Sequence, residues 1–207
     1  QWYPFLDALA AQCFHNEYVF WQGEDEEARL QALNLQDEWD YKIAACYSPL
    51  NQKEQLQKER ELAATIPALE EVTDEVSKIV KAQYEQNPYP RWEKMQLPPP
   101  RPVREEINRV LPHQAPSAFA GLPDAPEVLV AGCGTGRHAL QVAARYKDAE
   151  VLGIDLSSAS LGYAKGKIEE LGFSERIELM QADILSLGKL NRKFDIIESA
   201  GVLHHMQ

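Results

Sequence analysis

Cysteine, long apolar runs and positive charge are all scarce in this sequence of 207 residues. The three cysteines, Cys13, Cys46 and Cys133, are an odd and scattered set, which argues against a disulfide framework and has no spacing typical of a metal site. No uninterrupted apolar run approaches the roughly 18 residues that a membrane-spanning helix needs. The first four residues lack the basic flank of a signal peptide. We therefore expect a reduced, soluble, cytoplasmic protein with no metal site and no membrane partner.

Basic residues are outnumbered, with 21 lysines and arginines against 32 aspartates and glutamates, so the formal charge is −11 at pH 7. Nucleic-acid binding relies on clustered cations, so this balance argues against a DNA partner and makes RNA the least favoured substrate. The charge is also uneven, because residues 1–100 carry 18 acidic and 9 basic side chains, whereas residues 101–207 carry 14 and 12. This asymmetry predicts two differently built regions.

The prolines mark the joint between these regions, since ten of the thirteen lie between Pro88 and Pro126. Proline fixes φ, lacks a backbone donor and disfavours helix in the residue before it. We expect a proline-rich connector over residues 88–126, interrupted by one short helix at Val103–Leu111. Before the connector, apolar residues recur at helical spacings of three and four, which predicts a helical N-terminal domain over residues 1–87. These residues are Leu6, Leu9, Cys13 and Phe14, and later Val72, Val76, Ile79, Val80 and Tyr84.

After the connector the pattern changes to short apolar runs at residues 128–131, 151–154, 177–180 and 194–197. Helix-length stretches at Arg137–Tyr146 and Ser158–Leu171 separate the first three runs, and Gly172 follows the second helix where a helix stop belongs. Only a short polar turn, Ser186–Lys193, precedes the fourth run. This alternation is typical of a parallel α/β sheet whose strands are buried on both faces.

A glycine-rich turn, residues 132–136 (GCGTG), lies between the first strand and its helix. Such a turn lets a ligand approach the backbone closely, and the helix start offers free N–H groups. A dinucleotide fingerprint, G-x-G-x-x-G, would place its third glycine at position 137, but here the third glycine is Gly136. The shift favours a nucleoside without a pyrophosphate, and a tight turn with no ligand is the alternative.

Two aspartates end the next two strands. Asp155, after the second strand, is placed to accept the ribose hydroxyls, although a helix cap is the alternative. Asp183, after the third strand, suits an exocyclic amine or else a turn cap. Leu156 and Ile184 could pack on a flat ring.

With these motifs in chain order, the segments 127–138, 153–157, 181–185 and 194–206 resemble the class I S-adenosylmethionine-dependent methyltransferases. A second likeness is narrower: residues 83–92 (QYEQNPYPRW), with 9–14 and 16–20, resemble a bacterial subfamily in which this domain follows tetratricopeptide repeats. The resemblance implies a doubly wound, Rossmann-like sheet and the transfer of a methyl group from S-adenosylmethionine, as cofactor, to an unidentified acceptor. The acidic charge favours a protein or a small molecule over RNA as that acceptor.

Carried over residue by residue, the resemblance implies one candidate cofactor site. The glycine loop would lie on the methionine and ribose side of the cofactor. Asp155 would hold the ribose and Asp183 would meet the adenine amine. Leu156 and Ile184 would pack on the adenine ring. Ser199, after the fourth strand, would border the methionine moiety. Many members carry an acidic residue before the first glycine, where this chain has Ala131. The candidate cofactor-binding residues are Gly132, Cys133, Gly134, Gly136, Asp155, Leu156, Asp183, Ile184 and Ser199.

Further candidates lie before the first strand and after the fourth strand in the sequence. His204 and His205 follow the fourth strand on the expected acceptor side, where one could serve as general base, or both could be structural. Tyr84 and Arg91 precede the sheet in an aromatic, proline-stiffened segment. They are candidates for a lid over the cofactor, with a packed linker as the alternative.

The class I fold has seven strands, whereas this sequence holds four, so we expect an incomplete, C-terminally truncated domain over residues 127–207. Its strands should lie in the order 3-2-1-4, with the fourth strand an open edge through which two chains could associate. We expect weak cofactor binding and poor catalysis. The alternatives are a non-catalytic binding or protein-interaction scaffold and a nicotinamide oxidoreductase, against which the glycine spacing argues.

Overall fold

The computed structural model describes residues 2–15, 24–47, 53–86, 88, 90–113 and 116–203. Its contacts divide the chain into two compact units, one of residues 1–58 with 90–92 and the other of residues 59–89 with 93–207. Within the part of the chain that is described, no helix combines the length and the apolar character that crossing a membrane requires.

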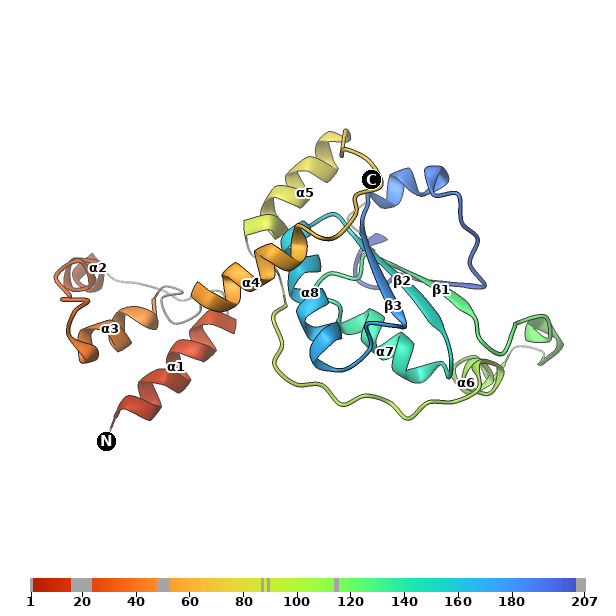
Figure 1. The fold of residues 1–207 in the computed structure, drawn as a ribbon, viewed down its shortest axis with the longest axis horizontal. Coiled ribbons are helices and arrows are strands. Elements are labelled where there is room, and N and C mark those ends of the chain that lie inside the picture. Colours follow the sequence, from red (N-terminus) through yellow and green to blue (C-terminus); the bar gives the residue numbers. More distant parts are fainter. Residues whose placement is uncertain are drawn as a thin grey trace. The chain divides into compact units, whose positions relative to one another are not determined.

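The first unit contains α1 (Tyr3–His15), α2 (Glu24–Gln31) and α3 (Glu38–Ala45), and α4 (Lys53–Ala63) begins within it (Figure 1). Helices α1 and α3 pack around the buried side chains of Ala10, Ala45 and Cys46. An ion pair of 2.7 Å between Lys42 and Asp7 also joins them. The helical pattern predicted for this region is present, although Leu9 is 38% exposed.

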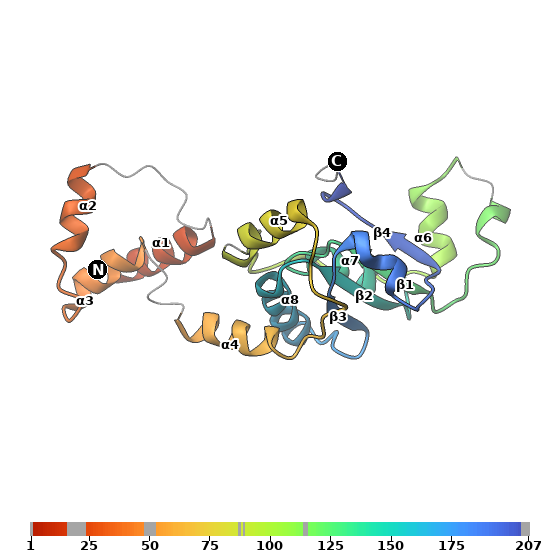
Figure 2. The ribbon, with the colours of Figure 1, turned by 90° about the horizontal axis from the view of Figure 1, so that it is seen from above.

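The second unit contains a four-stranded sheet of β1 (Glu127–Ala131), β2 (Glu150–Asp155), β3 (Ile177–Gln181) and β4 (Ile196–Glu198). All pairings are parallel and the order is β3-β2-β1-β4, as predicted (Figure 2). Helices α7 (Arg137–Arg145) and α8 (Ser158–Glu170) end within one residue of the predicted positions. At the end of α8, Gly172 adopts φ +76°, and the N–H of Phe173 donates to the carbonyl of Ile168, so a glycine stops the helix as expected.

Both faces of the sheet are covered, which explains the nearly continuous apolar strands. Right-handed crossovers in this strand order place α7 and α8 on one face (Figure 1). The other face carries Leu129, Leu152 and Ile154, which pack against side chains of residues 184–194. Part of that segment is a 3₁₀ helix, η3 (Ile184–Lys189), where the sequence analysis predicted only a polar turn. The side chain of Asp183 starts this helix by accepting a hydrogen bond from the N–H of Leu185.

Residues 59–86 group with the sheet by their contacts, whereas the sequence analysis assigned them to the N-terminal helices. Helix α5 (Glu75–Gln86) packs on α8. Its predicted apolar positions do not form one buried face, because Val76 and Ile79 are 57% and 71% exposed. Just before α5, residues 67–69 run beside β3, where the N–H of Leu69 donates to the carbonyl of Gln181.

From residue 93 onward, the connector belongs to the second unit. The backbone of Arg101 exchanges hydrogen bonds with Arg145 and Lys147 at the end of α7. The short helix predicted in this stretch is present as α6 (Val103–Val110), and a 3₁₀ turn, η2 (Pro116–Phe119), follows. The buried carboxylate of Glu106 in α6 accepts from the guanidinium of Arg109, which lowers the pKa of Glu106.

A half-buried polar cluster ties the short edge strand β4 to α7. The carboxylate of Glu198 accepts from Arg145 at 2.6 Å and from Tyr146 at 2.9 Å, and lies 2.9 Å from His138 Nε2. Burial opposes ionisation of Glu198, but the His138 contact and the Arg145 charge outweigh it and lower its pKa from 4.5 to about 2. The ionised carboxylate therefore stabilises the fold.

We predict that Glu198→Gln destabilises the second unit by about 2–3 kcal/mol at neutral pH. Because the folded pKa is depressed, the contribution of Glu198 is fully present above pH 4.5 and is lost as the pH falls toward 2. Hydrogen exchange of the β1 amides at several pH values measures this, and the difference from wild type should shrink on acidification. The matched control is Glu178→Gln, whose exposed pair with Arg192 should contribute less than about 1 kcal/mol. An equal effect of both variants would contradict the assignment.

Candidate functional site

The carboxyl ends of the four parallel strands meet at one edge of the sheet, where ligands of open α/β sheets bind. The glycine loop follows β1, Asp155 ends β2, Asp183 follows β3 and Ser199 follows β4. The topology therefore brings the predicted cofactor-binding residues to a single edge. What each contributes depends on the local geometry.

All three glycines of the loop have positive φ: +78° at Gly132, +51° at Gly134 and +83° at Gly136. Residues with a side chain rarely adopt this conformation. The loop is fastened to β2, since the N–H groups of Gly132 and Cys133 both donate to the carbonyl of Ile154 at 2.9 Å. The thiol of Cys133 is buried, which raises its pKa well above the ordinary value and leaves it protonated.

The three glycines differ in what surrounds them. A Cβ at Gly132 would lie 2.3 Å from the side chain of Val202, and one at Gly136 would lie 2.7 Å from the Cβ of Ala164. At Gly134 a Cβ would meet no atom within 4 Å. Packing alone therefore accounts for Gly132 and Gly136, whereas Gly134 faces open space that a ligand can enter.

Asp155 joins the loop to the start of α8. One carboxylate oxygen accepts from the N–H of Gly134 at 2.8 Å and the other from the N–H of Ser157 at 3.0 Å. Burial raises the pKa of Asp155, although the hydrogen bonds from Ser157 and Gly134 partly counter that rise. Each carboxylate oxygen has a further lone pair with which to accept from a ligand hydroxyl. A half-buried carboxylate with a raised pKa beside an open glycine is the combination expected of a functional site.

Asp183 and the apolar candidates lie around the ends of β2 and β3. Asp183 is buried, and its side chain caps η3, so the capping alternative of the sequence analysis is observed for one of its oxygens. Leu156 and Ile184 are half-buried, and the side-chain amide of Gln181 donates to the carbonyl of Leu156 at 2.8 Å. Ile184 also packs against the core of the sheet.

Ser199 links the end of the edge strand β4 to the end of β1. Its hydroxyl donates to the carbonyl of Ala131 at 2.9 Å, so the residue before the glycine loop is engaged through its backbone. Ala131 brings no carboxylate to this position. The catalytic candidates His204 and His205 lie outside the described residues.

The two lid candidates fall in different units. The guanidinium of Arg91 lies over the ring of Phe14, 4.6 Å from its centroid, within the first unit. Tyr84 lies in the second unit, where its backbone carbonyl accepts from the hydroxyl of Ser157 at 3.0 Å. Two further residues here, Ser157 and Glu85, were not predicted to have a role, and Glu85 also contacts the start of α8. A serine just before a predicted helix is a recognisable cap signal, but nothing local marks Glu85 as its partner.

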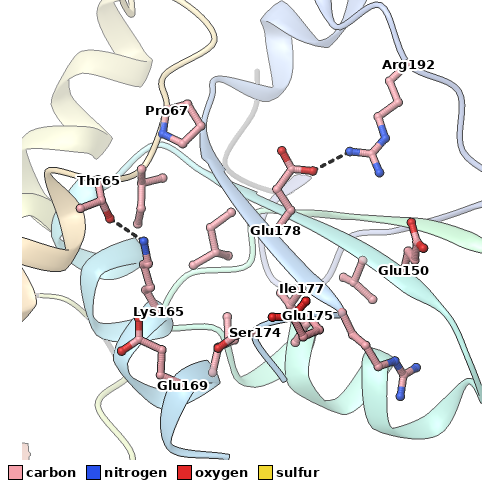
Figure 3. Close-up of a pocket in the computed structure, with 15 residues that line it drawn as sticks. Thr65, Pro67, Glu150, Lys165, Glu169, Ser174, Glu175, Ile177, Glu178 and Arg192 are labelled. Carbon is pink, nitrogen blue, oxygen red and sulfur yellow. Dashed lines mark hydrogen bonds and ion pairs between the residues drawn. The ribbon is translucent and has the colours of Figure 1, made fainter. Parts of the chain in front are cut away.

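A cavity of about 470 Å³ lies elsewhere, along the outer edge of β3 (Figure 3). Thr65 and Pro67 line it, together with Lys165 of α8 and the ion pair between Glu178 and Arg192. None of the predicted cofactor residues lines this cavity. Across the described ranges, no group of three or more histidine, cysteine or acidic side chains is placed to hold a metal ion.

Comparison with known proteins gives residues 128–207 as a match to the family described as "Methyltransferase domain". An uncharacterised protein of Synechococcus sp. is 31% identical over 65% of this chain and 32% of its own length. The release factor glutamine methyltransferase of Rhodopirellula baltica is 31% identical over 47% of this chain and 33% of its own. The chain thus spans about a third of the length of these relatives.

Among solved structures, magnesium protoporphyrin IX methyltransferase from Synechocystis PCC 6803 with bound SAM aligns with a TM-score of 0.44. Its identity is 23%, and the alignment covers 67% of each chain. The family match therefore covers the sheet from the second residue of β1 onward, together with the glycine loop.

Proposed function

We propose that the protein transfers a methyl group from S-adenosylmethionine to an acceptor that is a protein or a small molecule. The observation that carries this proposal is the hydrogen bond between the N–H of Gly134 and the half-buried carboxylate of Asp155, beside open space at the carboxyl edge of the sheet. Partial burial of a carboxylate there costs stability, which favours a binding role. The names of the methyltransferase relatives point the same way.

In this proposal Asp155 accepts from the ribose hydroxyls, while the backbone at Gly134 borders the cofactor without a side chain in the way. Leu156 and Ile184 flank the adenine, Asp183 accepts from its amine, and Ser199 borders the methionine moiety. The oxygen of Asp183 that caps η3 has one acceptor site fewer for the amine.

S-adenosylmethionine supplies a methyl group bonded to a sulfonium sulfur, and this bond activates the methyl carbon for displacement. The chain's residues then have to hold donor and acceptor in line, and proximity and alignment can provide much of the rate. A base is needed only where the acceptor must lose a proton. We propose His204 or His205 for that role.

A second candidate function is a binding scaffold without catalysis, in which the acidic helical region recruits partners. The observation that favours it is the absence of a carboxylate at Ala131. The glycine spacing makes a nicotinamide oxidoreductase the least favoured alternative.

Titration calorimetry with S-adenosylmethionine, S-adenosylhomocysteine and NAD distinguishes these functions. We expect heat of binding from the first two ligands and none from NAD, because the loop has no third glycine at the dinucleotide position. Binding of NAD alone would contradict the proposal. Binding of none of the three would favour the scaffold.

Asp155→Asn should weaken S-adenosylhomocysteine binding by about 10- to 100-fold, since charge-assisted hydrogen bonds to the ribose are lost. Equilibrium binding by calorimetry measures this. The matched control is Asp124→Asn, because the Asp124 side chain is 98% exposed and lies outside the site. Equal affinities of wild type and Asp155→Asn would contradict the proposed contact between Asp155 and the ribose.

Tyr84→Phe tests the proposed lid. If the phenol contacts the polar end of the cofactor, the variant should bind S-adenosylmethionine about three- to tenfold more weakly. The backbone carbonyl of Tyr84, which receives the Ser157 hydroxyl, is unaffected by the change. Unchanged affinity, measured by the same titration, would limit Tyr84 to this backbone contact.

A further inference from the structure

The carboxyl end of α5 is joined to the start of α8 by a set of hydrogen bonds. The carboxylate of Glu85 accepts from the N–H of Ser158 at 2.8 Å, from the N–H of Ala159 at 3.0 Å and from the hydroxyl of Ser158 at 3.1 Å. One residue earlier, the carbonyl of Tyr84 accepts from the hydroxyl of Ser157. The N-cap residue of α8, Ser157, and the first two residues of the helix are thus fastened to α5.

Helix starts need such partners because their first N–H groups have no acceptor within the helix. In α8 the local cap is Ser157, whose hydroxyl oxygen accepts from the N–H of Ser160 at 3.0 Å. Glu85 supplies two further acceptors from 73 and 74 residues away in the sequence. Its negative charge also lies at the positive end of the helix dipole, where it is stabilising.

The N-cap residue of α8 also orients the candidate ribose carboxylate. The N–H of Ser157 donates to one oxygen of Asp155, and the N–H of Gly134 donates to the other. A continuous series of hydrogen bonds therefore runs from α5, through residues 157–159, to Asp155 and the glycine loop. The negative charge of Glu85 is also close enough to contribute to the raised pKa of Asp155.

Apolar burial explains only part of the position of α5. Val80 and Tyr84 are half-buried, but Val76 and Ile79 are largely exposed. The polar contact of the half-buried Glu85 is therefore a further attachment of α5 to α8. It reaches the start of α8, directly after the strand that ends at Asp155.

We propose that Glu85 is a positioning residue for the nucleoside site: it fixes the backbone of residues 157–159 so that Asp155 presents its carboxylate to the ribose hydroxyls. The identity of the ligand in this inference rests on the proposed function. The fixing of residues 157–159 by Glu85 rests on the hydrogen bonds alone, so these two parts are tested separately.

The structural part is tested without ligand, by hydrogen exchange of the full chain. Glu85→Ala should speed exchange at the Gly134 and Ser157 amides, which are bonded to Asp155, by about tenfold or more. Glu85→Gln keeps a carbonyl oxygen as acceptor and should have a smaller effect. The matched control is Glu75→Ala on the same helix, since Glu75 is 83% exposed and pairs only with Lys78 among the contacts of the described residues. Unchanged exchange at Gly134 and Ser157 in Glu85→Ala would overturn the proposal.

The functional part is tested by calorimetry with S-adenosylhomocysteine. Glu85→Ala should weaken binding by about tenfold, Glu85→Gln by less, and Glu75→Ala by less than about twofold. Because Glu85 acts through Asp155, its effect should largely vanish in the Asp155→Asn background, so that the double variant binds like Asp155→Asn alone.

A purely structural role would give the same loss in both backgrounds, and that result would overturn positioning through Asp155. No binding by the wild-type chain would instead contradict the proposed function. The hydrogen-exchange comparison would then still decide whether Glu85 orders residues 157–159.

Discussion

The parallel register of the four strands is the constraint on which the rest of the second unit depends. Because β1 pairs with both β2 and β4, and β2 with β3, every strand points the same way and all the following loops emerge at one edge. The pairing brings residues that are far apart in the sequence, such as Gly134 and Asp155, together at this edge. The Glu198 cluster maintains this arrangement where it is weakest, at the three-residue strand β4.

At this edge, fold stability and ligand binding favour different partners for a carboxylate. The half-buried carboxylate of Glu198 is compensated by His138 and Arg145, and its pKa falls accordingly. Asp155 is half-buried too, but backbone N–H groups are its partners and its pKa rises. A cation beside Asp155 would stabilise the fold but would occupy the acceptor sites that a ribose needs. The contrast between the two carboxylates separates a structural acid from one suited to binding.

Local signals in the sequence were sufficient for much of this fold. Helices α7 and α8 were predicted within a residue because apolar periodicity and Gly172 are encoded in contiguous residues. The strand order followed from the family resemblance, and the pairings confirm it. The 3₁₀ helix η3 was missed, because the Asp183 that caps it was interpreted first as a ligand for adenine. Long-range contacts were not predictable, since nothing around Glu85 indicates that it caps a helix beginning at Ser158.

The unequal surroundings of the three loop glycines have a consequence for related chains. A relative that had lost the nucleoside but kept the fold would still need glycine where Val202 and Ala164 press on the loop, at positions 132 and 136. Only at position 134, where the space is open, could a small side chain such as asparagine, which tolerates positive φ, enter without displacing a neighbour. The residue at that one position, rather than the glycine motif as a whole, therefore distinguishes a chain under selection for binding from one under selection for folding alone.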